Sequence, residues 1–440
     1  MSNIKPQEVH GVLSKYMLAD GMEFVVDLDR SHGCYLNDLN TGKEYLDFFT
    51  FFASLPIGFN HPDLMTKEFK EKLARASVNK PSNSDLYTVE MAEFVETFFR
   101  VAVKSTDLKH LFFVDGGGLA VENALKTAMD WKVRKNFAKG LKTEKGHKII
   151  HFQEAFHGRT GYTLSLTNTA DPRKYMYFAK FDWPRVLNPK VKFPLNEINL
   201  ADVKRKEEEC IAQIKNILAQ DKDDIAAFIM EPIQGEGGDN HFRPEFVKQI
   251  RALADENDFL LIFDEVQTGM GLTGKWWAYE YFGVPADIIA FGKKSQTCGI
   301  AASKRVEEVE KNVFAESSRL NSTWGGNLTD MVRAKKYLEV IEKEKLVENA
   351  ANMGKYMTDS LLALGTKYPK ITNIRGKGLM IAFDFETSEI RNKAVDEIKN
   401  NGVLVLPCGN RSIRLRPALN VAKKECDQAL TAFENAFKAV

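Results

Sequence analysis

Short apolar runs recur along the middle of the chain and alternate with segments whose apolar residues have the spacing of a helix. Five runs have the length and the flanking residues of buried strands: 111–114, 148–152, 225–230, 259–263 and 288–292. The segment 245–256 is one of the helical patterns between them. Because strands and helices alternate from about residue 65 to 330, we expect an α/β layer fold there.

The two ends of the chain have other patterns. Residues 1–64 are mixed, with short alternating stretches at 23–28 and 42–48. After Gly325 and Gly326 a long helical pattern runs through Tyr337 and Val340, and the apolar runs 378–383 and 403–406 follow it. We therefore expect an α+β region in 331–440.

Length and composition narrow the class of protein. A chain of 440 residues is too long for one compact core, so two domains are expected. The 44% hydrophobic and 28% charged residues are ordinary for a globular protein, and a net charge of +1 favours neither nucleic acid nor a membrane as a partner. No signal peptide or membrane span is visible, and five scattered cysteines lack metal-ligand spacing. We expect reduced thiols and a cytoplasmic protein.

Asp264 and Lys293 form the most informative pair of polar residues. Each directly follows or closes an apolar run, and Lys293 lies 29 residues beyond Asp264. Because neighbouring strand ends meet at one crevice of an open α/β sheet, the carboxylate and the amine can face one ligand. Pyridoxal phosphate (PLP) enzymes need a lysine for the Schiff base and an acid at the pyridinium nitrogen. Taken alone, the two residues fit a capped strand end and a surface lysine equally well.

Three glycines at 116–118 follow the apolar run 111–114 and precede a segment of strong helix-forming residues. A glycine loop that leads into a helix offers free backbone N–H groups and the positive end of the helix dipole to a phosphate. Gly117 and Gly118 are therefore candidate phosphate ligands. A tight strand-to-helix turn would also use glycine, and the Gly-Lys-Ser/Thr of a Walker loop is missing.

Three further residues could contact an aromatic cofactor or its substrate. Phe156 could stack on a ring, Arg159 could hold a carboxylate with two hydrogen bonds, and Gln267 could donate to a ring oxygen. For single residues of these types, a core aromatic and solvated polar side chains are the more common roles.

Polar loops later in the chain add candidate anion and cation sites. Glu236 lies at the tip of the glycine-rich segment 231–238, and Thr323 could bring a hydroxyl to an anion. Arg414 and Arg416 are two residues apart in an extended segment, so they share one face. Either arginine could anchor a carboxylate, or both could line a solvated edge.

Together these segments resemble the class III aminotransferases, which are fold-type I PLP enzymes. The resemblance rests on Asp-Glu-Val-Gln-Thr-Gly at 264–269 with its lysine 29 residues on, Phe-His-Gly-Arg at 156–159 and Glu-Pro-Ile-Gln-Gly-Glu-Gly-Gly at 231–238. It covers nearly the whole chain. It implies a large PLP-binding domain, 65–330, with a mostly parallel sheet flanked by helices, and a small α+β domain formed by 1–64 and 331–440.

The resemblance implies how the cofactor is bound. Lys293, rather than its neighbour Lys294, would form the Schiff base, and Asp264 would keep the ring nitrogen protonated. Gln267 would bond the ring hydroxyl, and Phe156 would stack on the ring.

The resemblance also implies that the phosphate is shared between two subunits. Gly117 and Gly118 would bind it together with Thr323 of a second subunit, which implies a homodimer with composite active sites. Gly118 departs from the family, which usually has Ser or Ala there, so a hydroxyl contact is lost.

Within the class, segments 118–126, 155–169, 180–185 and 319–331 resemble enzymes that act on the ε-amino group of lysine. This implies ping-pong transfer of that group from L-lysine to 2-oxoglutarate, giving 2-aminoadipate 6-semialdehyde and L-glutamate. Another ω-aminotransferase, acting on ornithine, 4-aminobutyrate or a diamine, is the alternative. A non-catalytic relative would have lost Lys293 or Asp264, and a dinucleotide enzyme would need G-x-G-x-x-G.

Such a site must bind lysine by its far amine and glutamate by its α-amine. Arg159 can hold the remote carboxylate of either substrate, and the resemblance adds Asn321 as a substrate contact. Glutamate's second carboxylate needs another cation; the sequence alone leaves Arg414 and Arg416 open, and the resemblance favours Arg414, which matches the first arginine of the family's Arg-Leu-Arg-Pro. Because an unpaired buried arginine is costly, we expect Glu236 to pair with Arg414 while lysine is bound and to move aside for glutamate.

Overall fold

A seven-stranded sheet forms the centre of the computed structural model, which describes residues 4–440. In spatial order its strands are β3 (Leu108–Val114), β11 (Cys298–Ser303), β10 (Ile288–Phe291), β9 (Leu260–Asp264), β6 (Ile225–Met230), β4 (Lys148–Phe152) and β5 (Arg185–Val186). Only β11 runs antiparallel to its neighbours. The predicted α/β fold with a mostly parallel sheet is confirmed; β11 and the two-residue β5 are the strands that the apolar pattern did not single out.

Helices cover both faces of this sheet, because successive side chains of a strand point to opposite faces. Leu260 and Ile262 of β9 pack in a core with α5 (Gly117–Ala138). Leu261 and Phe263 pack in a second core with α7 (Glu197–Asp221) and α8 (Pro244–Asn257). Each fully buried side chain of this kind contributes roughly 1.5–3 kcal/mol, so burial on both faces holds the strand in the middle of the sheet.

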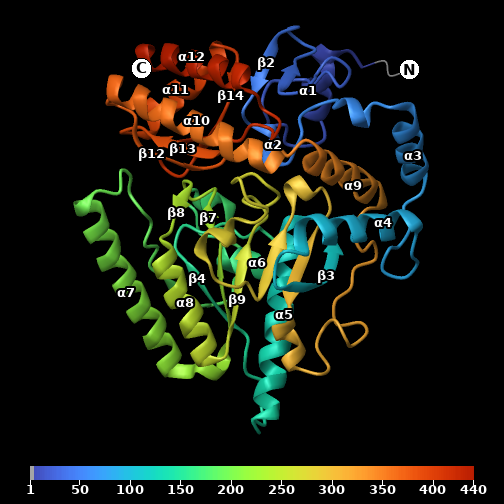
Figure 1. The fold of residues 1–440 in the computed structure, drawn as a ribbon, viewed down its shortest axis with the longest axis vertical. Coiled ribbons are helices and arrows are strands. Elements are labelled where there is room, and N and C mark those ends of the chain that lie inside the picture. Colours follow the sequence, from blue (N-terminus) through green and yellow to red (C-terminus); the bar gives the residue numbers. More distant parts are fainter. Residues whose placement is uncertain (1–3) are drawn as a thin grey trace.

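The two ends of the chain pack together above the large sheet, as the blue and the orange-to-red segments show (Figure 1). β2 (Glu44–Asp47) pairs with β1 (Tyr35–Asn37) on one side and in parallel with β14 (Val403–Leu404) on the other. Phe48 of the first segment shares a hydrophobic core with Phe383 and Phe433 of the last. The N-terminal segment is therefore built into the C-terminal region rather than standing alone.

A four-stranded antiparallel sheet completes the C-terminal region, in the order β12 (Thr372–Lys377), β13 (Met380–Asp384), β16 (Ser412–Leu415) and β15 (Leu406–Cys408). Its helices are α10 (Leu346–Lys367), α11 (Ser388–Asn400) and α12 (Lys423–Ala439). The apolar run 403–406 is divided, because the chain passes at Val405 from a pair with β2 to a pair with β16. The stretch 23–28 forms only an isolated bridge between Val26 and Asp38.

The remaining α-helices are α1 (Val9–Leu13), α2 (Thr50–Ala53), α3 (Lys67–Val78), α4 (Val89–Phe98), α6 (Gly161–Leu166) and α9 (Leu328–Lys343), and a small ribbon pairs β7 (Ile233–Gln234) with β8 (Asn240–His241). α9 is the long helix predicted after the two glycines; the Asn327 side chain caps it by accepting from the Thr329 N–H. All five cysteines are buried and unpaired. Among residues 4–440, no helix has the length and apolar character to cross a membrane.

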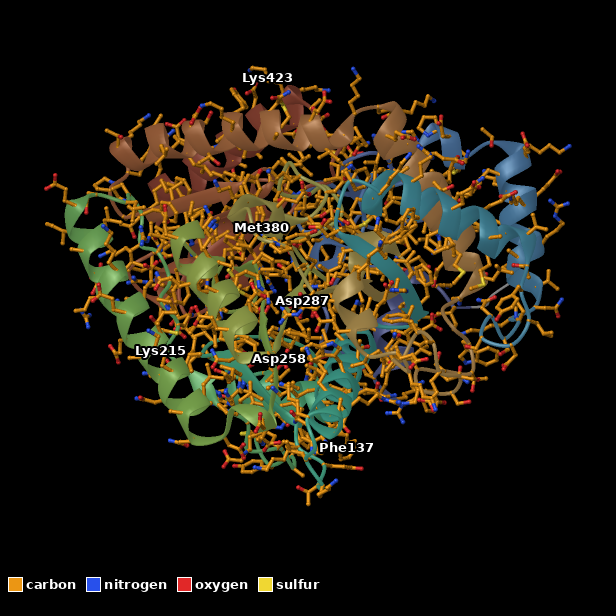
Figure 2. The ribbon with its side chains drawn as sticks, turned by 60° about the horizontal axis from the view of Figure 1, so that its bottom comes forward. Phe137, Lys215, Asp258, Asp287, Met380 and Lys423 are labelled. Carbon is orange, nitrogen blue, oxygen red and sulfur yellow. The ribbon has the colours of Figure 1, made fainter. Side chains whose placement is uncertain are left out.

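The two edges of the large sheet differ in what they face. Asp258 and Asp287, labelled in Figure 2, precede β9 and β10 at the amino edge, whereas Met380 marks the C-terminal region. The arrowheads of β3 and β9 point toward that region in Figure 1. Side chains at the carboxyl edge are therefore enclosed between the sheet and the C-terminal region, where open α/β sheets bind ligands.

Candidate active site

Loops from the carboxyl ends of neighbouring strands meet around Lys293. Asp264 ends β9, Lys293 follows β10 after Gly292, and the glycine loop follows β3. A Cβ on Gly292 would lie 3.6 Å from Cα of Gly117, and a Cβ on Gly158 would lie 2.9 Å from Cα of Gly118. The glycine loop thus touches both the residue before Lys293 and the loop that carries Phe156.

The structure distinguishes the two adjacent lysines. Nζ of Lys294 donates to the backbone oxygens of Ala53 (3.1 Å) and Gln267 (2.9 Å), and the side chain is buried. Nζ of Lys293 makes no hydrogen bond or ion pair with residues 4–440. Burial and the nearby Arg414 lower the pKa of Lys293 to about 8. Lys293 is therefore the amine that is available for chemistry.

Asp264 is held by a partner that sequence reasoning missed. Nδ1 of His157 lies 2.8 Å from Oδ2 of Asp264, and the Val266 N–H donates to Oδ1 at 3.1 Å. His157 is buried, and its Nε2 has no partner. His157 is the histidine of the Phe-His-Gly-Arg motif, so the sequence did contain a sign of its importance. Its hydrogen bond to Asp264, however, depends on how β4 and β9 are placed in the sheet.

The N-terminus of α5 fits a phosphate. Gly116 adopts φ of 102° and no side chain caps the helix, so the N–H groups of its first turn are open. A Cβ on Gly117 would lie 2.9 Å from Cγ1 of Val266, and one on Gly118 would lie 3.3 Å from Cγ2 of Thr160. At Gly118 the methyl group of Thr160 lies so close that an added Cβ would have to displace it slightly.

Gln267 is oriented as a donor. Its Oε1 accepts from Nη2 of Arg416 at 3.0 Å, which leaves the amide Nε2 free to donate to a ring oxygen. A Cβ on Gly235 would lie 2.4 Å from the same Oε1, so only glycine allows this approach. The donor set therefore fits the phosphate and the hydroxylated ring of PLP, with Asp264 for the ring nitrogen.

Glu231, also missed by the sequence reasoning, joins two loops of the site. Its two carboxylate oxygens accept from the backbone N–H groups of Phe156 and Gly235, each at 3.0 Å. Burial raises the pKa of Glu231 to about 7. Phe156, the candidate stacking residue, is thus held by its backbone and keeps a partly exposed ring.

The two arginines of β16 and the segment after it have different partners. Nη2 of Arg416 pairs with Oδ1 of Asp239 at 2.5 Å, and both side chains are buried. Nη2 of Arg414 pairs with Oε2 of Glu236 at 2.8 Å, and the Glu236 side chain is 23% exposed. Arg416 is committed to a buried pair, so Arg414 is the better candidate for the second carboxylate.

Glu236 has a second cationic partner, Lys174, which no sequence pattern singled out. Nζ of Lys174 pairs with Oε1 of Glu236, while Arg414 takes Oε2. Burial alone would raise the pKa of Glu236, but Arg414 and Lys174 outweigh it and hold the pKa below its usual value. The carboxylate therefore stays charged between two cations.

Arg159 and the segment that contains Asn321 and Thr323 lie at the surface. Arg159 is exposed and has no ion pair with residues 4–440. Asn321 and Thr323 are exposed too, and the backbone oxygen of Thr323 accepts from Oγ of Ser82. The structure of one chain does not bring Asn321 and Thr323 together with Lys293.

The segment 50–53, labelled α2, contacts both arginines and has an unusual backbone. Its residues have φ of 42°, 50°, 60° and 65°, a left-handed turn that non-glycine residues adopt rarely and at a cost. The ring of Phe52 lies 5.9 Å from the guanidinium of Arg414, and Oγ1 of Thr50 donates to the backbone oxygen of Arg416 at 2.6 Å. Strained backbone is common at functional sites, which agrees with the position of this segment.

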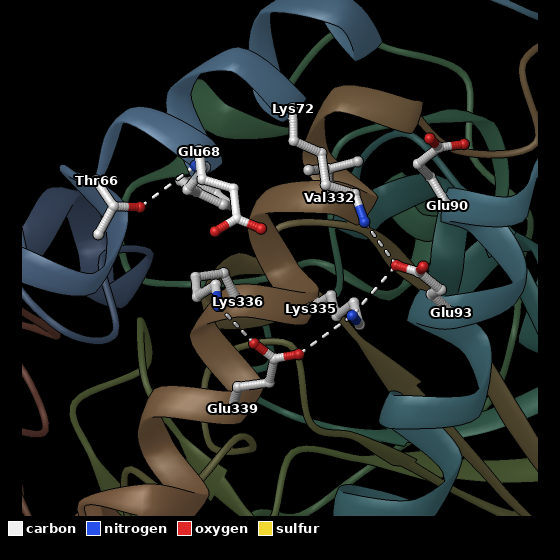
Figure 3. A pocket seen from close by; sticks show the side chains of 10 residues that line it. Thr66, Glu68, Lys72, Glu90, Glu93, Val332, Lys335, Lys336 and Glu339 are labelled. Atoms are coloured by element: carbon white, nitrogen blue, oxygen red, sulfur yellow. Dashed lines mark hydrogen bonds and ion pairs between the residues drawn. The ribbon is translucent and has the colours of Figure 1, made fainter.

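A separate hollow of about 190 Å³ lies between α3, α4 and α9 and shares no residue with this group (Figure 3). Lys72 and Lys335 both pair with Glu93, at 2.7 and 3.2 Å. Lys336 pairs with Glu339 at 2.8 Å. Each of these three lysines is therefore paired with a glutamate of the hollow, unlike Lys293.

Comparisons with known proteins agree with this geometry. The family model for class-III aminotransferases matches residues 16–437. The L-lysine-epsilon aminotransferase of Mycobacterium tuberculosis is 52% identical over 437 residues, which cover 99% of this chain and 96% of that protein. The L-lysine-epsilon aminotransferase of Streptomyces clavuligerus is 47% identical over 443 residues, covering 100% and 96%.

A solved structure extends the match to three dimensions. The lysine aminotransferase from M. tuberculosis in the internal aldimine form superposes with a TM-score of 0.96 at 52% identity, over 99% of this chain and 100% of that one. It confirms the fold-type I prediction and, with the family match, PLP as the cofactor. The chain belongs to the class-III aminotransferase family.

Proposed function

We propose that the protein transfers the ε-amino group of L-lysine to 2-oxoglutarate, giving 2-aminoadipate 6-semialdehyde and L-glutamate. The observation that carries the proposal is the ion pair between Glu236 and Arg414 at 2.8 Å, while Arg159 has no ion pair among residues 4–440. One free cation suits a substrate whose single carboxylate lies far from the reacting amine. A neutralised second cation suits the apolar chain that such a substrate brings next to the reacting carbon.

Lysine is proposed over other ω-amino substrates because of the relatives. Proteins named L-lysine-epsilon aminotransferase are 47–52% identical to this chain over nearly its whole length. The pair of Glu236 and Arg414 by itself suits ornithine or 4-aminobutyrate equally well, since both carry one carboxylate remote from the amine.

The residues around Lys293 divide the chemistry. When bound, PLP supplies a carbonyl that exchanges amino groups and a ring that takes up the negative charge of the reacting carbon. Lys293 would take a proton from the substrate's ε-carbon and deliver it to the former carbonyl carbon of the cofactor, because its pKa of about 8 leaves much of the amine neutral near pH 8. Asp264, oriented by His157, holds the proton at the ring nitrogen. Gln267 would donate to the ring hydroxyl, and Gly117 and Gly118 would bind the phosphate.

The same residues serve the second substrate after one change of partners. Arg159 holds the distal carboxylate of 2-oxoglutarate as it holds that of lysine, with Asn321 as a further contact. Glu236 leaves Arg414, and the α-carboxylate takes its place in a two-pronged hydrogen bond.

We also propose a homodimer in which Thr323 reaches the partner's phosphate. Thr323 is exposed, and apolar side chains are exposed near it and at 86–89, among them Trp324 and Tyr87 at 42% and 79%.

We propose that residues 65–330 form the PLP-binding domain. Residues 1–64 and 331–440 would form the small domain, which is supported by the hydrophobic core that the two segments share. Unpaired buried cysteines favour the cytoplasm.

The test is an assay of L-lysine, ornithine and 4-aminobutyrate as donors to 2-oxoglutarate. We expect kcat/KM for lysine to exceed the others by at least about tenfold, with glutamate formed in equal amount to the semialdehyde. If ornithine or 4-aminobutyrate is preferred, lysine is wrong as the amino donor, but the protein is still an ω-aminotransferase. Lys293→Ala should abolish both the activity and the covalent attachment of cofactor by borohydride; attachment that survives would move the reactive amine elsewhere.

A further inference from the structure

The carboxylate of Glu236 is shared between two cations that lie on different parts of the molecule. Arg414 belongs to β16, and its side chain is only 3% exposed. Lys174 ends the short 3-10 helix Pro172–Lys174 in the loop after α6, and its side chain is 25% exposed. Each cation contacts a different oxygen of Glu236.

Exchange of substrates breaks only one of these contacts. The α-carboxylate of a dicarboxylate substrate needs Arg414, so the Arg414–Glu236 bond has to open. A partly buried carboxylate that loses all its partners is costly. The bond from Lys174 to Oε1 does not involve Arg414, so it can persist when Oε2 is released.

Resting on the proposed function, we infer that Lys174 is a positioning residue that retains Glu236 after it leaves Arg414, and thereby determines how readily the site accepts a dicarboxylate substrate. Without Lys174, Glu236 still has Arg414 in the paired state but has no cation in the open state. Loss of Lys174 therefore disfavours the open state and leaves the paired state, which lysine uses, largely intact.

The ring of Phe156 gives Lys174 a fixed place. Nζ of Lys174 lies 6.0 Å from the centre of that ring, and the Phe156 backbone is held by Glu231. The cation is therefore placed beside the candidate stacking residue and not free in solvent. A lysine that only anchored its loop would have no reason to treat the two substrates differently.

The experiment compares two non-reacting ligands on the PLP-loaded enzyme by calorimetry. Glutarate carries two carboxylates and needs Arg414, whereas hexanoate carries one and does not. In Lys174→Met we expect the Kd of glutarate to rise about tenfold and that of hexanoate to change by less than about twofold. Lys174→Arg should restore glutarate binding to within about threefold. The KM for 2-oxoglutarate should rise as the Kd for glutarate does, with kcat of the lysine half-reaction kept.

Two controls make the outcome decisive. Lys180→Met removes a lysine of the same loop whose Nζ contacts only the backbone oxygens of Tyr175 and Phe178, and it should leave both ligands unchanged. In a Glu236→Ala background, Lys174→Met should have no effect on glutarate. An equal loss for both ligands, or a loss that persists without Glu236, would overturn the inference. The two Kd measurements use no amino donor, so a different amino donor would refute the proposed function and leave this inference standing.

Discussion

Nδ1 of His157, in the loop after β4, lies 2.8 Å from Oδ2 of Asp264, which ends β9, and both side chains are buried. With the other ring nitrogen of His157 unpartnered, Nδ1–H is the natural donor, so the imidazole fixes one face of the carboxylate. Its other oxygen, Oδ1, accepts from the Val266 N–H at 3.1 Å, so the carboxylate that is proposed to face the ring nitrogen of PLP is held at both oxygens.

His157→Phe removes this donor while keeping a flat ring of similar size. We expect kcat to fall about 10- to 100-fold, since a hydrogen bond to a charged group contributes roughly 1.5–3 kcal/mol. The loss should be equal in both half-reactions, because Asp264 serves both. Rapid mixing with lysine and with glutamate separately measures it. His151→Phe is the matched control, a buried histidine of β4 that is bonded to Arg185 and not to Asp264; a loss confined to one half-reaction would contradict the role of His157.

The pKa of Lys293 gives a prediction on pH. The amine has to be neutral to attach the cofactor, and burial with Arg414 lowers its pKa from 10.5 to about 8. The rate at which apoenzyme takes up PLP should therefore rise with pH and level off above a midpoint near 8. Arg414→Met removes a positive charge that disfavours the protonated amine, so the midpoint should move up. Arg414→Lys keeps the charge and should keep the midpoint; an unchanged midpoint in Arg414→Met would show that Arg414 does not act on Lys293.

The chemistry at the carboxyl edge of the sheet could be predicted from the sequence because it follows from local patterns. Asp264 and Lys293 each end or follow a short apolar run, and their strands β9 and β10 are parallel neighbours, so both ends lie at one edge of the sheet. The glycine loop likewise precedes a segment of strong helix-forming residues, which is α5 in the structure.

What the sequence could not supply depends on partners far along the chain. Arg414 and Arg416 share one face, and they were separable only after Glu236 and Asp239 of a single loop were placed against them. Lys174 lies in a loop without periodicity, so nothing local marks it. Asn321 and Thr323 lie apart from Lys293 within one chain, so the roles proposed for them require a second subunit.

The glycine loop offers a test of steric fit. Gly117→Ala would place a Cβ 2.9 Å from Cγ1 of Val266, so the helix N-terminus has to shift. We expect the Kd for PLP to rise about tenfold, as overpacking of this kind costs ~1–3 kcal/mol. Val266→Ala removes the opposing methyl groups, and the double variant should recover most of the affinity. Equilibrium dialysis measures both; a double variant as weak as Gly117→Ala would mean that the glycine is needed for another reason.

Asp239 and Arg416 form the most deeply buried ion pair beside the site, with side chains 0% and 1% exposed. Asp239→Ala leaves the Arg416 guanidinium with Gln267 as its side-chain partner and no counter-charge. We expect the free energy of unfolding to fall by about 3–5 kcal/mol, the usual cost of removing one member of a buried pair. Glu236→Ala, whose carboxylate is 23% exposed, should cost less, because water can enter beside Arg414. Urea unfolding of both variants at one protein concentration compares them, and equal losses would mean that the exposure of Glu236 does not matter. We expect this difference in stability because the two carboxylates have different proposed roles. Asp239 holds Arg416 in place beside Gln267, whereas Glu236 has to be able to leave Arg414 when a dicarboxylate substrate binds.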